Sequence, residues 1–334
     1  MPGTEPDADF DWRPGAAIGV LRLRARLMAR IRAFFAERDV LEVDTPALGR
    51  AATTDPAIES FATAYRGPGA AAGLPLYLHS SPEFCMKRLL AAASGAIYQL
   101  SHVFRNGEAG SRHNPEFMLL EWYRPGFDQH ALMQEIDALL GSVLNGHIDY
   151  RPARRITYRQ WFIDETGLDP WSDGVDAFRK FSVAHLASVP QAMPDDALDP
   201  WLDLLLTHWL EPRLGAGALF VYDYPVSQAS LARIRRQPVP VAERFELYIN
   251  GVELANGFRE LADSDEQAQR FTRENQVRTD AQRPVMPVDG KMLAALGHGL
   301  PDSSGVALGF DRLVMLAAGL PHIDAAMPFS LQRN

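Results

Sequence analysis

The residues that could do chemistry gather first in the segment from Phe104 to Tyr123. Arg105 follows an apolar run, a turn-rich loop containing Asn114 comes next, and a second apolar run carries Glu121. Two apolar runs joined by a loop of Gly, Ser, Asn and Pro predict a β-hairpin. An arginine beside a strand that carries carboxylates can hold a nucleoside triphosphate next to an amine. The segment therefore predicts a site for both.

A second predicted hairpin carries two further carboxylates. Glu246 and Glu253 flank Asn250-Gly251, a dipeptide typical of tight hairpin turns. Antiparallel strands bring such positions near each other, and two facing carboxylates favour a cation between them. Mg²⁺ that also binds phosphate oxygens fits this chemistry. The alternative is that both are exposed strand carboxylates, and this alternative is favoured when the pair is considered alone.

Near the C-terminal end, a strand that contains glycine leads directly into a helix. Gly309 would let a flat ring or a phosphate approach the backbone, because it has no side chain. Arg312 could make a forked contact with a terminal phosphate. Pairing of Arg312 with an acidic neighbour is the alternative.

The composition limits the classes of function. The chain has 334 residues, of which 47% are hydrophobic and 22% charged, so it can bury a large core. We expect a flexible tail at 1–15 and a single domain at 16–334. A net charge of −9 disfavours indiscriminate binding of nucleic acid. Arginine clusters within 22–32 and 151–159 predict solvated helix faces, with a docking patch for an acidic partner as the alternative.

Features of the sequence also predict the cellular location. The single cysteine, Cys85, excludes an intramolecular disulfide and fits a reducing cytosol; its apolar neighbours favour a small buried residue over a nucleophile. The first residues are acidic, unlike a signal peptide. No apolar run reaches membrane-spanning length. We expect a cytoplasmic protein without a membrane segment.

The elements that must position the candidate residues follow from periodicity and turn signals. Apolar residues every four positions predict a helix at 20–39, followed by a strand at 40–46 that Pro46 ends. Ser81 is expected as an N-cap, with Pro82 in the first helical position. Strand pairs joined by tight turns favour an α+β fold with a mostly antiparallel sheet flanked by helices. The other predicted strands are 76–79, 97–105, 117–124, 220–224, 242–249, 252–258 and 305–310, and the other predicted helices lie at 128–144, within 175–215, at 264–279 and at 311–319.

The order of these elements resembles the class II aminoacyl-tRNA synthetases. Their three motifs correspond to the helix and strand ending at Pro46, the hairpin that begins at Phe104-Arg105, and the segment from Gly309 to Arg312. The runs Arg112-His113-Asn114-Pro115-Glu116-Phe117 and Glu253-Leu254-Ala255-Asn256-Gly257-Phe258 are similar to the lysyl-tRNA synthetase branch. The resemblance extends from about residue 20 onward. It implies the class II catalytic fold and a homodimer formed through 22–39 and 40–46.

The resemblance also implies roles for individual residues. Arg105 would hold the α-phosphate of ATP and Arg312 the γ-phosphate, which makes both catalytic, while Phe117 would stack on adenine. Further contacts to ATP are implied for Asn106, Gly107, Asn114, Glu253, Leu254 and Gly309. The implied amino-acid pocket consists of Ser81, Pro82, Glu83, Tyr123, Asn256, Glu260 and Ala307.

Within that pocket the implied roles differ. Glu83, with Ser81 nearby, would meet the amine next to the carboxylate, and Asn256 would lie near the carboxylate itself. Tyr123 and Glu260 would receive the distant ammonium. Glu246 and Glu253 would share Mg²⁺.

Two departures from lysyl-tRNA synthetases change the implied acceptor. Those enzymes have an anticodon-binding barrel before the first motif, whereas here that motif begins near residue 22, and Ala307 stands where they usually have glycine. Both features are similar to the elongation factor P–(R)-β-lysine ligases. The resemblance then implies ATP, Mg²⁺, β-lysine and elongation factor P as reactants or partners, and not tRNA. The methyl group of Ala307 is worth only about 1–3 kcal/mol of discrimination.

A third departure lies at Gly107, where the synthetase pattern has a glutamate that contacts adenine. Either Glu108 supplies this contact or it is lost, at a cost of about 0.5–1.5 kcal/mol. Three alternative functions stay open on the sequence. They are a free-standing enzyme that charges tRNA, a catalytically silent lysine-binding paralogue, and an amide ligase that acts on a small-molecule amine.

Overall fold

The computed structural model describes residues 12–333. Its helices are α1 Ile18–Ala36, α2 Glu83–Ala91, α3 Gln129–Val143, α4 Tyr158–Thr166, α5 Val175–His185, α6 Asp199–Leu205, α7 Ser264–Asp280, α8 Gly290–Gly299 and α9 Phe310–Ala318. Its strands are β1 Leu41–Glu42, β2 Leu48–Gly49, β3 Ala62–Tyr65, β4 Leu74–Leu78, β5 Ile97–Phe104, β6 Glu116–Pro125, β7 Arg154–Thr157, β8 Ala218–Tyr224, β9 Ile234–Arg235, β10 Val241–Ile249, β11 Val252–Arg259 and β12 Ser303–Gly309.

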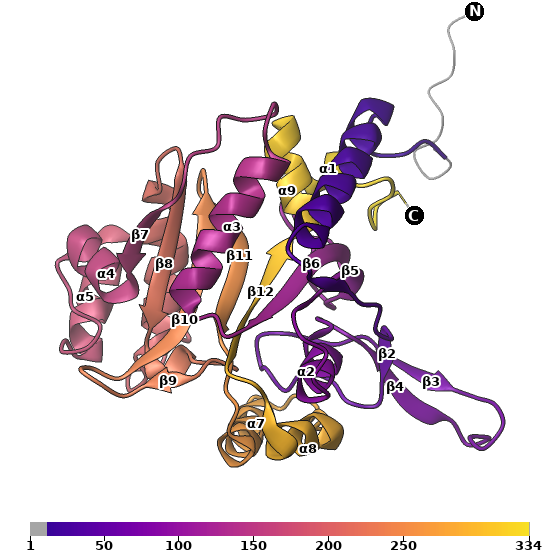
Figure 1. The fold of residues 1–334 in the computed structure, drawn as a ribbon. Coiled ribbons are helices and arrows are strands. Elements are labelled where there is room, and N and C mark those ends of the chain that lie inside the picture. Colours follow the sequence, from indigo (N-terminus) through magenta and orange to yellow (C-terminus); the bar gives the residue numbers. More distant parts are fainter. Residues whose placement is uncertain (1–11, 334) are drawn as a thin grey trace, which may run out of the picture.

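These strands form two sheets within the described range (Figure 1). The larger sheet has the order β1-β5-β6-β12-β11-β10-β8-β7, with β9 paired to β10, and the smaller has the order β2-β4-β3. In the larger sheet, β1 pairs with β5 and β7 with β8 in parallel, and the other pairs are antiparallel. The prediction of a mostly antiparallel sheet flanked by helices is confirmed.

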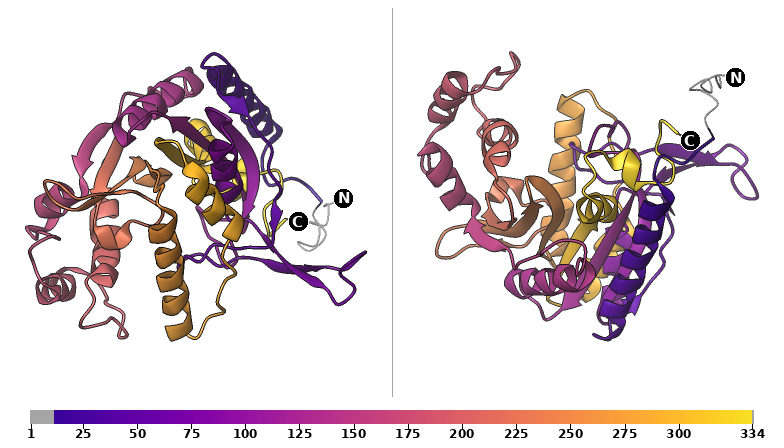
Figure 2. Two further views of the ribbon diagram at one scale, coloured as in Figure 1. Left: turned by 60° about the horizontal axis from the view of Figure 1, so that its bottom comes forward. Right: turned by 90° about the horizontal axis from the view of Figure 1, so that it is seen from above.

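The two faces of the large sheet have different neighbours. Helices α1, α3 and α9 cover one face, while α2, α7 and α8 lie together below the sheet (Figures 1 and 2). Because side chains alternate along a strand, β6 buries Leu120 and Trp122 under the first group of helices and turns Glu121 and Tyr123 to the opposite face. Helices α4, α5 and α6 form a second apolar cluster at the β8 end.

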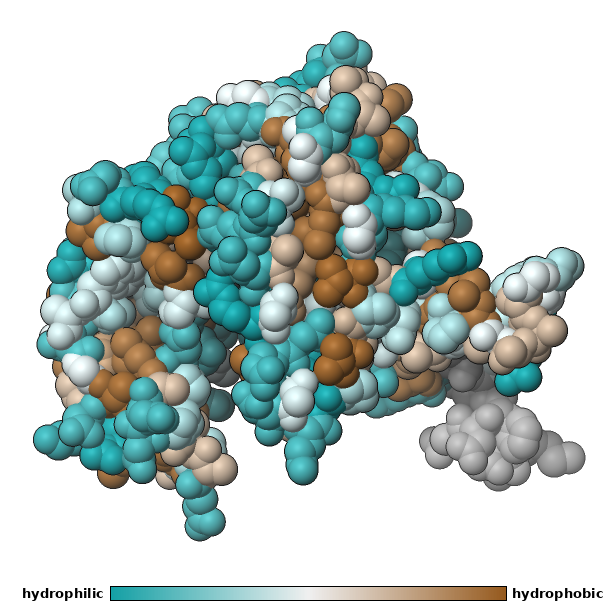
Figure 3. All heavy atoms as spheres, turned by 90° about the horizontal axis from the view of Figure 1, so that it is seen from below, coloured by the Kyte–Doolittle hydropathy of each residue, from teal (hydrophilic) through white to brown (hydrophobic). Residues whose placement is uncertain are grey.

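Seen from below, the molecule has a mostly hydrophilic surface with separate hydrophobic patches (Figure 3). A hollow separates the central part of the molecule from the part on the left of this view. Among residues 12–333 no helix is long and apolar enough to cross a membrane. The tail predicted at 1–15 falls mainly on residues 1–11, which are outside the described part of the chain. Its last residue, Gly15, donates its N–H to the carbonyl oxygen of Pro328 at 2.9 Å.

The sequence located the long elements correctly and missed several short ones. The predicted strand 40–46 is wrong in extent, because only Leu41–Glu42 form a strand. The start of α2 is also displaced by one residue: Pro82 is the N-cap, although the hydroxyl of Ser81 accepts the N–H of Glu83 at 3.0 Å. Elements without a sequence prediction are β2, β3, β7, β9, α4 and α8.

One arginine near the start of the chain contradicts the prediction of a solvated basic face. Arg24 is buried and forms an ion pair with Asp311, the second residue of α9, which is 1% exposed. The other carboxylate oxygen of Asp311 accepts the N–H of Met118 in β6 at 2.7 Å. Arg24 therefore connects α1, β6 and α9, while Arg22 and Arg26 remain exposed as predicted.

We expect Arg24→Met to destabilise the protein by about 3–5 kcal/mol, because it leaves the buried carboxylate of Asp311 without its counter-charge. Arg22→Met, on the exposed face of the same helix, is the matched control and should change stability by less than about 0.5 kcal/mol. Urea-induced unfolding of the three proteins measures both values. Equal unfolding midpoints for the two variants would contradict the structural role of the ion pair.

Candidate active site

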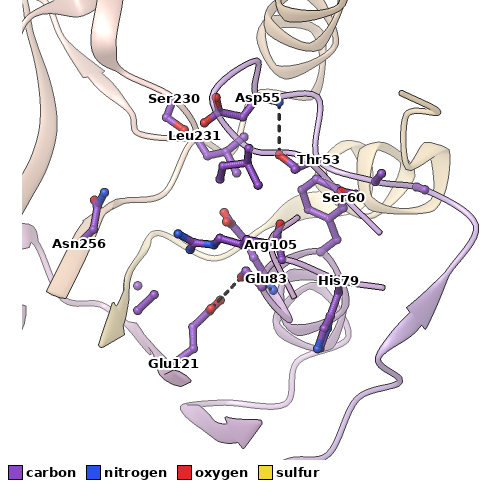
Figure 4. Close-up of a pocket in the computed structure, with 18 of the residues that line it drawn as sticks. Thr53, Asp55, Ser60, His79, Glu83, Arg105, Glu121, Ser230, Leu231 and Asn256 are labelled. Carbon is purple, nitrogen blue, oxygen red and sulfur yellow. Dashed lines mark hydrogen bonds between the residues drawn. The ribbon is translucent and has the colours of Figure 1, made fainter. Parts of the chain in front are cut away.

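Two adjoining cavities open on the face of the sheet opposite α1 and α3. The first lies among α2, the loop 51–60 and the pocket face of β6, β11 and β12 (Figure 4), and the second lies along the β5–β6 hairpin beside the start of α9. Both cavities are lined by Ile58, Arg105, Asn256 and Ala307. Figure 4 shows Arg105 extending into the first cavity, with Glu83 close by and Asn256 across from it. One ligand that occupies both cavities would therefore pass Arg105.

The register of the sheet places the candidate residues in rows across neighbouring strands. Glu121 pairs with Ala307, Ala307 with Asn256, and Asn256 with Glu246. Two residues along β6, Tyr123 pairs with Gly305. Segments that are nearly two hundred residues apart in sequence thus form one floor, which is why the candidate residues occur in separate motifs.

A buried cluster of charges fills the deep end of the first cavity. The ammonium of Lys87 lies 2.6 Å from a carboxylate oxygen of Glu83 and 2.7 Å from one of Glu260. Glu121 accepts hydrogen bonds from the hydroxyls of Tyr123 and Ser81, each at 2.7 Å. The predicted pocket residues Ser81, Glu83, Tyr123 and Glu260 are therefore brought together, and Pro82 lies behind them as a buried residue of the helix start.

Electrostatics in this cluster favour neutral acids and a charged lysine. Burial, followed by the charge of Glu83, raises the pKa of Glu121 to about 7. Burial likewise raises the pKa of Glu260 to about 8, against the opposing effect of Lys87. Burial alone would lower the pKa of Lys87, but Glu260 and Glu83 outweigh it and raise that pKa above its ordinary value.

Room for this cluster depends on a glycine in β12. A Cβ atom on Gly305 would lie 2.4 Å from a ring carbon of Tyr123 and 2.5 Å from a carboxylate oxygen of Glu260. Any side chain at this position would therefore displace the two residues that the sequence assigns to the distant ammonium. Ala307 lies two residues further along β12, on the same face. It pairs with Glu121 on one side and Asn256 on the other, and its methyl group is the only side-chain carbon of β12 between them.

Three arginines line the second cavity, Arg105, Arg112 and Arg312, together with the carboxylates of Glu108, Glu253 and Asp311. The guanidinium of Arg105 lies 5.1 Å from the centre of the Phe117 ring, and 3.6 Å separates it from the carboxylate of Glu108. Arg312 donates to the carbonyl oxygen of Glu253 at 2.7 Å and lies 2.9 Å from the imidazole of His113. Burial, then the charge of Arg312, lowers the pKa of His113. Positive charge thus faces this cavity from both the hairpin and α9, as a triphosphate site requires.

Some of the other predicted ATP contacts line the second cavity, and others do not. Leu254 and Gly309 line the second cavity, and so does Glu108, the carboxylate next to Gly107. Asn106 and Gly107 are exposed and line neither cavity. Asn114 lines the second cavity, but its amide bonds the carbonyl oxygen of Glu116 at 2.6 Å and the N–H of Leu331 at 3.0 Å. One donor and one lone pair of Asn114 remain for a ligand.

The predicted carboxylate pair lies on the second hairpin, whose register contains a bulge. The turn Asn250-Gly251 forms as predicted, with φ of 51° and 73°. Glu253 pairs with Tyr248, as a two-residue turn requires, and a bulge between Leu247 and Tyr248 then leaves Glu246 opposite Asn256. Glu246 is held by Arg244 and by the hydroxyl of Tyr248, each at 2.5 Å, whereas Glu253 faces Arg312 at 3.3 Å. Among the described residues, no group of three or more His, Cys, Asp or Glu forms a ready metal site.

Sequence reasoning missed Lys87 as a member of the site and noticed Glu121 without assigning it a role. The signal for Lys87 was its position four residues after Glu83 on the same helix, which brings the two side chains together. Its contact with Glu260 joins segments that no local pattern connects. Glu121 was marked by its place two residues before Tyr123, on the same face of the strand.

Comparisons with known proteins agree with this geometry. A family model described as tRNA synthetases class II (D, K and N) matches residues 10–333, and this is the class that the fold and the paired cavities define. Elongation factor P–(R)-β-lysine ligases are among the relatives. The ligase of Photorhabdus laumondii subsp. laumondii is 48% identical over 328 residues, which cover 97% of this chain and 98% of the relative. The ligase of Vibrio cholerae serotype O1 is 48% identical over 324 residues, which cover 97% and 98%.

The chain belongs to the class II tRNA synthetases and, within them, to the family of elongation factor P–(R)-β-lysine ligases. The resemblance inferred from the sequence is therefore confirmed. So is the prediction of a ligase with a class II synthetase core that uses ATP.

We expect Gly305→Ala to raise the KM for the amino-acid substrate by about 5- to 150-fold, because overpacking a filled site costs about 1–3 kcal/mol. The KM for ATP should stay within about twofold, since the added methyl group points at Tyr123 and Glu260. Gly215→Ala is a suitable control, because a Cβ there meets nothing within 4 Å. ATP–pyrophosphate exchange measures both constants, and an unchanged amino-acid KM would contradict the assignment of the first cavity.

Proposed function

We propose that this protein activates (R)-β-lysine with ATP and transfers it to the ε-amino group of a lysine in elongation factor P. The observation that carries the proposal is the meeting of two unlike cavities at Arg105: one ends in buried carboxylates around a single lysine and suits ammonium groups, and the other has three arginines in its lining that can bind phosphates. The names of the relatives supply the identity of the amino acid and of the acceptor.

The first step joins the contents of the two cavities. A carboxylate oxygen of the amino acid attacks the α-phosphorus, a new C–O–P linkage forms, and the bond to pyrophosphate breaks. Arg105, at the junction, binds the α-phosphate and stabilises the charge that develops on it. Arg312 binds the γ-phosphate in exchange for its contact with Glu253. Positioning and charge stabilisation suffice for this step, which needs no side-chain nucleophile.

The second step consumes the adenylate. The neutral ε-amine of the acceptor lysine attacks the carbonyl carbon of the mixed anhydride, an amide bond forms, and AMP leaves with the electron pair of the broken C–O bond. The attacking nitrogen loses a proton to solvent or to the departing phosphate. None of the described side chains stands out as a general base for this transfer.

Carboxylate chemistry supports Mg²⁺ in the first step. Glu246 and Glu253 lie on the neighbouring strands β10 and β11, and Glu253 lines the second cavity; oxygen ligands of this kind suit Mg²⁺ when phosphate oxygens complete the shell. When bound, the ion neutralises charge on the triphosphate. Glu246 would exchange its contacts with Arg244 and Tyr248 for this role. Phe117, Asn114, Leu254 and Gly309 would hold the adenosine.

Recognition of the amino acid is assigned to the first cavity. Glu83 and Ser81 take the amine nearer the carboxylate, Asn256 faces the carboxylate, and Tyr123 with Glu260 takes the distant ammonium. The methyl of Ala307 narrows the floor between these two ends, which favours the β-amino isomer over α-lysine. Because the acceptor is a translation factor, we place the enzyme in the cytoplasm.

Transfer of labelled amino acid tests the function directly. We expect the protein to label elongation factor P with (R)-β-lysine at a rate at least tenfold above that with α-lysine, and to leave bulk tRNA unlabelled. Arg105→Ala should reduce labelling by at least a hundredfold, as the loss of one stabilising contact in a transition state does. Labelling of tRNA alone would favour the enzyme that charges tRNA, and absence of ATP–pyrophosphate exchange with either isomer would favour the silent paralogue.

We further propose a homodimer formed through α1, β1 and the segment that follows them. Exposed apolar side chains support this surface: Leu41 is 56% exposed and Leu48 is 48% exposed. We expect light scattering to give twice the mass of one 37.0 kDa chain at micromolar concentration. Leu41→Glu combined with Leu48→Glu should shift the mass to that of one chain, whereas a wild-type protein of single-chain mass would contradict the proposal.

A further inference from the structure

Lys87 is the basic member of the buried cluster, and the proposed reaction assigns it no role. Its side chain is 0% exposed, it reaches Glu83 and Glu260 at 2.6 and 2.7 Å, and its ammonium lies 5.5 Å from the centre of the Phe258 ring. A buried lysine costs several kcal/mol to ionise unless carboxylates surround it. A neutral side chain would fill the same space at no such cost, so the charge itself calls for an explanation.

The charges at the deep end of the first cavity do not balance. Glu83, Glu121 and Glu260 are carboxylic acids, and Lys87 is the only basic side chain that contacts them within the described part of the chain. With all of them ionised, three carboxylates against one ammonium leave two negative charges. One oxygen of Glu260 is buried there without a hydrogen-bond partner among the described residues. The cluster therefore lacks two positive charges.

We propose that Lys87 is a positioning residue that sets this deficit at two charges, so that the pocket is completed by a substrate with two ammonium groups and releases protons when such a substrate binds. The proposal rests on the proposed function, since the substrate is a diamino acid. Lys87 acts through Glu83 and Glu260: it contacts both from α2 and fixes the positions of their carboxylates at the cavity.

Protons take the place of the missing cations when the pocket is empty. Burial raises the pKa of Glu121 to about 7 and that of Glu260 to about 8, so near pH 7 much of the deficit is covered by protonation of these two acids. Tyr123, whose pKa burial and Glu121 raise well above its ordinary value, stays neutral. The other titratable side chains that line the cavity are Asp55, His79, Arg105 and Glu274.

Two consequences separate this arrangement from a merely structural ion pair. A diammonium substrate displaces the protons of Glu121 and Glu260, because each acid ionises beside an incoming ammonium. A substrate with one ammonium displaces fewer protons and leaves one acid neutral. Removal of the lysine charge leaves three carboxylates to share the deficit, which raises their pKa values further and moves substrate binding to higher pH.

The wild-type enzyme tests the first consequence. Titration calorimetry at pH 7 in two buffers of different ionisation enthalpy gives the number of protons released per ligand bound. We expect about one proton for (R)-β-lysine and α-lysine, and about half as many or fewer for 6-aminohexanoate, which has a single ammonium. Tight binding of either lysine isomer without proton release would overturn the inference.

Lys87→Met tests the second consequence, with the exposed Lys291→Met as its matched control. In ATP–pyrophosphate exchange at pH 7, we expect Lys87→Met to raise the KM for β-lysine at least tenfold while kcat changes less than threefold and the KM for ATP is unchanged. The fall of KM with rising pH should move upward by at least one pH unit, and Lys87→Arg should restore part of it. A folded Lys87→Met enzyme with the wild-type pH profile would overturn the inference.

The two experiments keep this inference separate from the proposed function. If Lys87→Met fails to fold, the wild-type calorimetry still decides between proton release and its absence. If neither lysine isomer binds the wild-type protein, the proposed function fails and with it the basis of the inference. If both bind but release no proton, the function stands and the role of Lys87 is refuted.

Discussion

The buried ion pair between Arg24 and Asp311 lies on the core side of the elements that carry the candidate active site, and it fixes their positions. Asp311 also accepts the N–H of Met118, so one carboxylate joins α1, β6 and α9. Arg312 directly follows Asp311 in the sequence, and Phe117 directly precedes Met118. Both line the second cavity. The residues assigned to the two ends of ATP are thus adjacent in sequence to a contact that faces the core, and their separation is set by that contact.

Much of this arrangement follows from the sequence, and the remainder has physical reasons for being hidden. The long helices and the two hairpins were predictable, because their periodicity and the Asn250-Gly251 turn are local signals. The single site at Arg105 was also predictable from the order of the motifs. Arg24 was misjudged because spacing alone does not distinguish an arginine on a solvated face from one that meets a carboxylate almost three hundred residues away.

Other differences between prediction and structure come from backbone details that residue types do not indicate. The bulge between Leu247 and Tyr248 places Glu246 opposite Asn256 and not opposite Ala255, and no residue type in that strand marks it. The short strands and α8 lack a long enough pattern to be read. Lys87 was overlooked because a lysine on an amphipathic helix is usually at the surface. Its burial depends on Glu260, which directly follows β11 and is distant from Lys87 in the sequence.

The four lining residues that the two cavities share also bear on the fate of the intermediate. An amino acid and a nucleotide that are not yet bonded must place a carboxylate and a phosphate side by side at Arg105, where the two anions repel. Once they are joined, a single anionic phosphodiester-like group occupies that position and both ends remain anchored. In the proposed reaction, the amino acid and ATP therefore bind separately and can dissociate separately. The adenylate is bound in both cavities at once, so it is retained until an amine cleaves it.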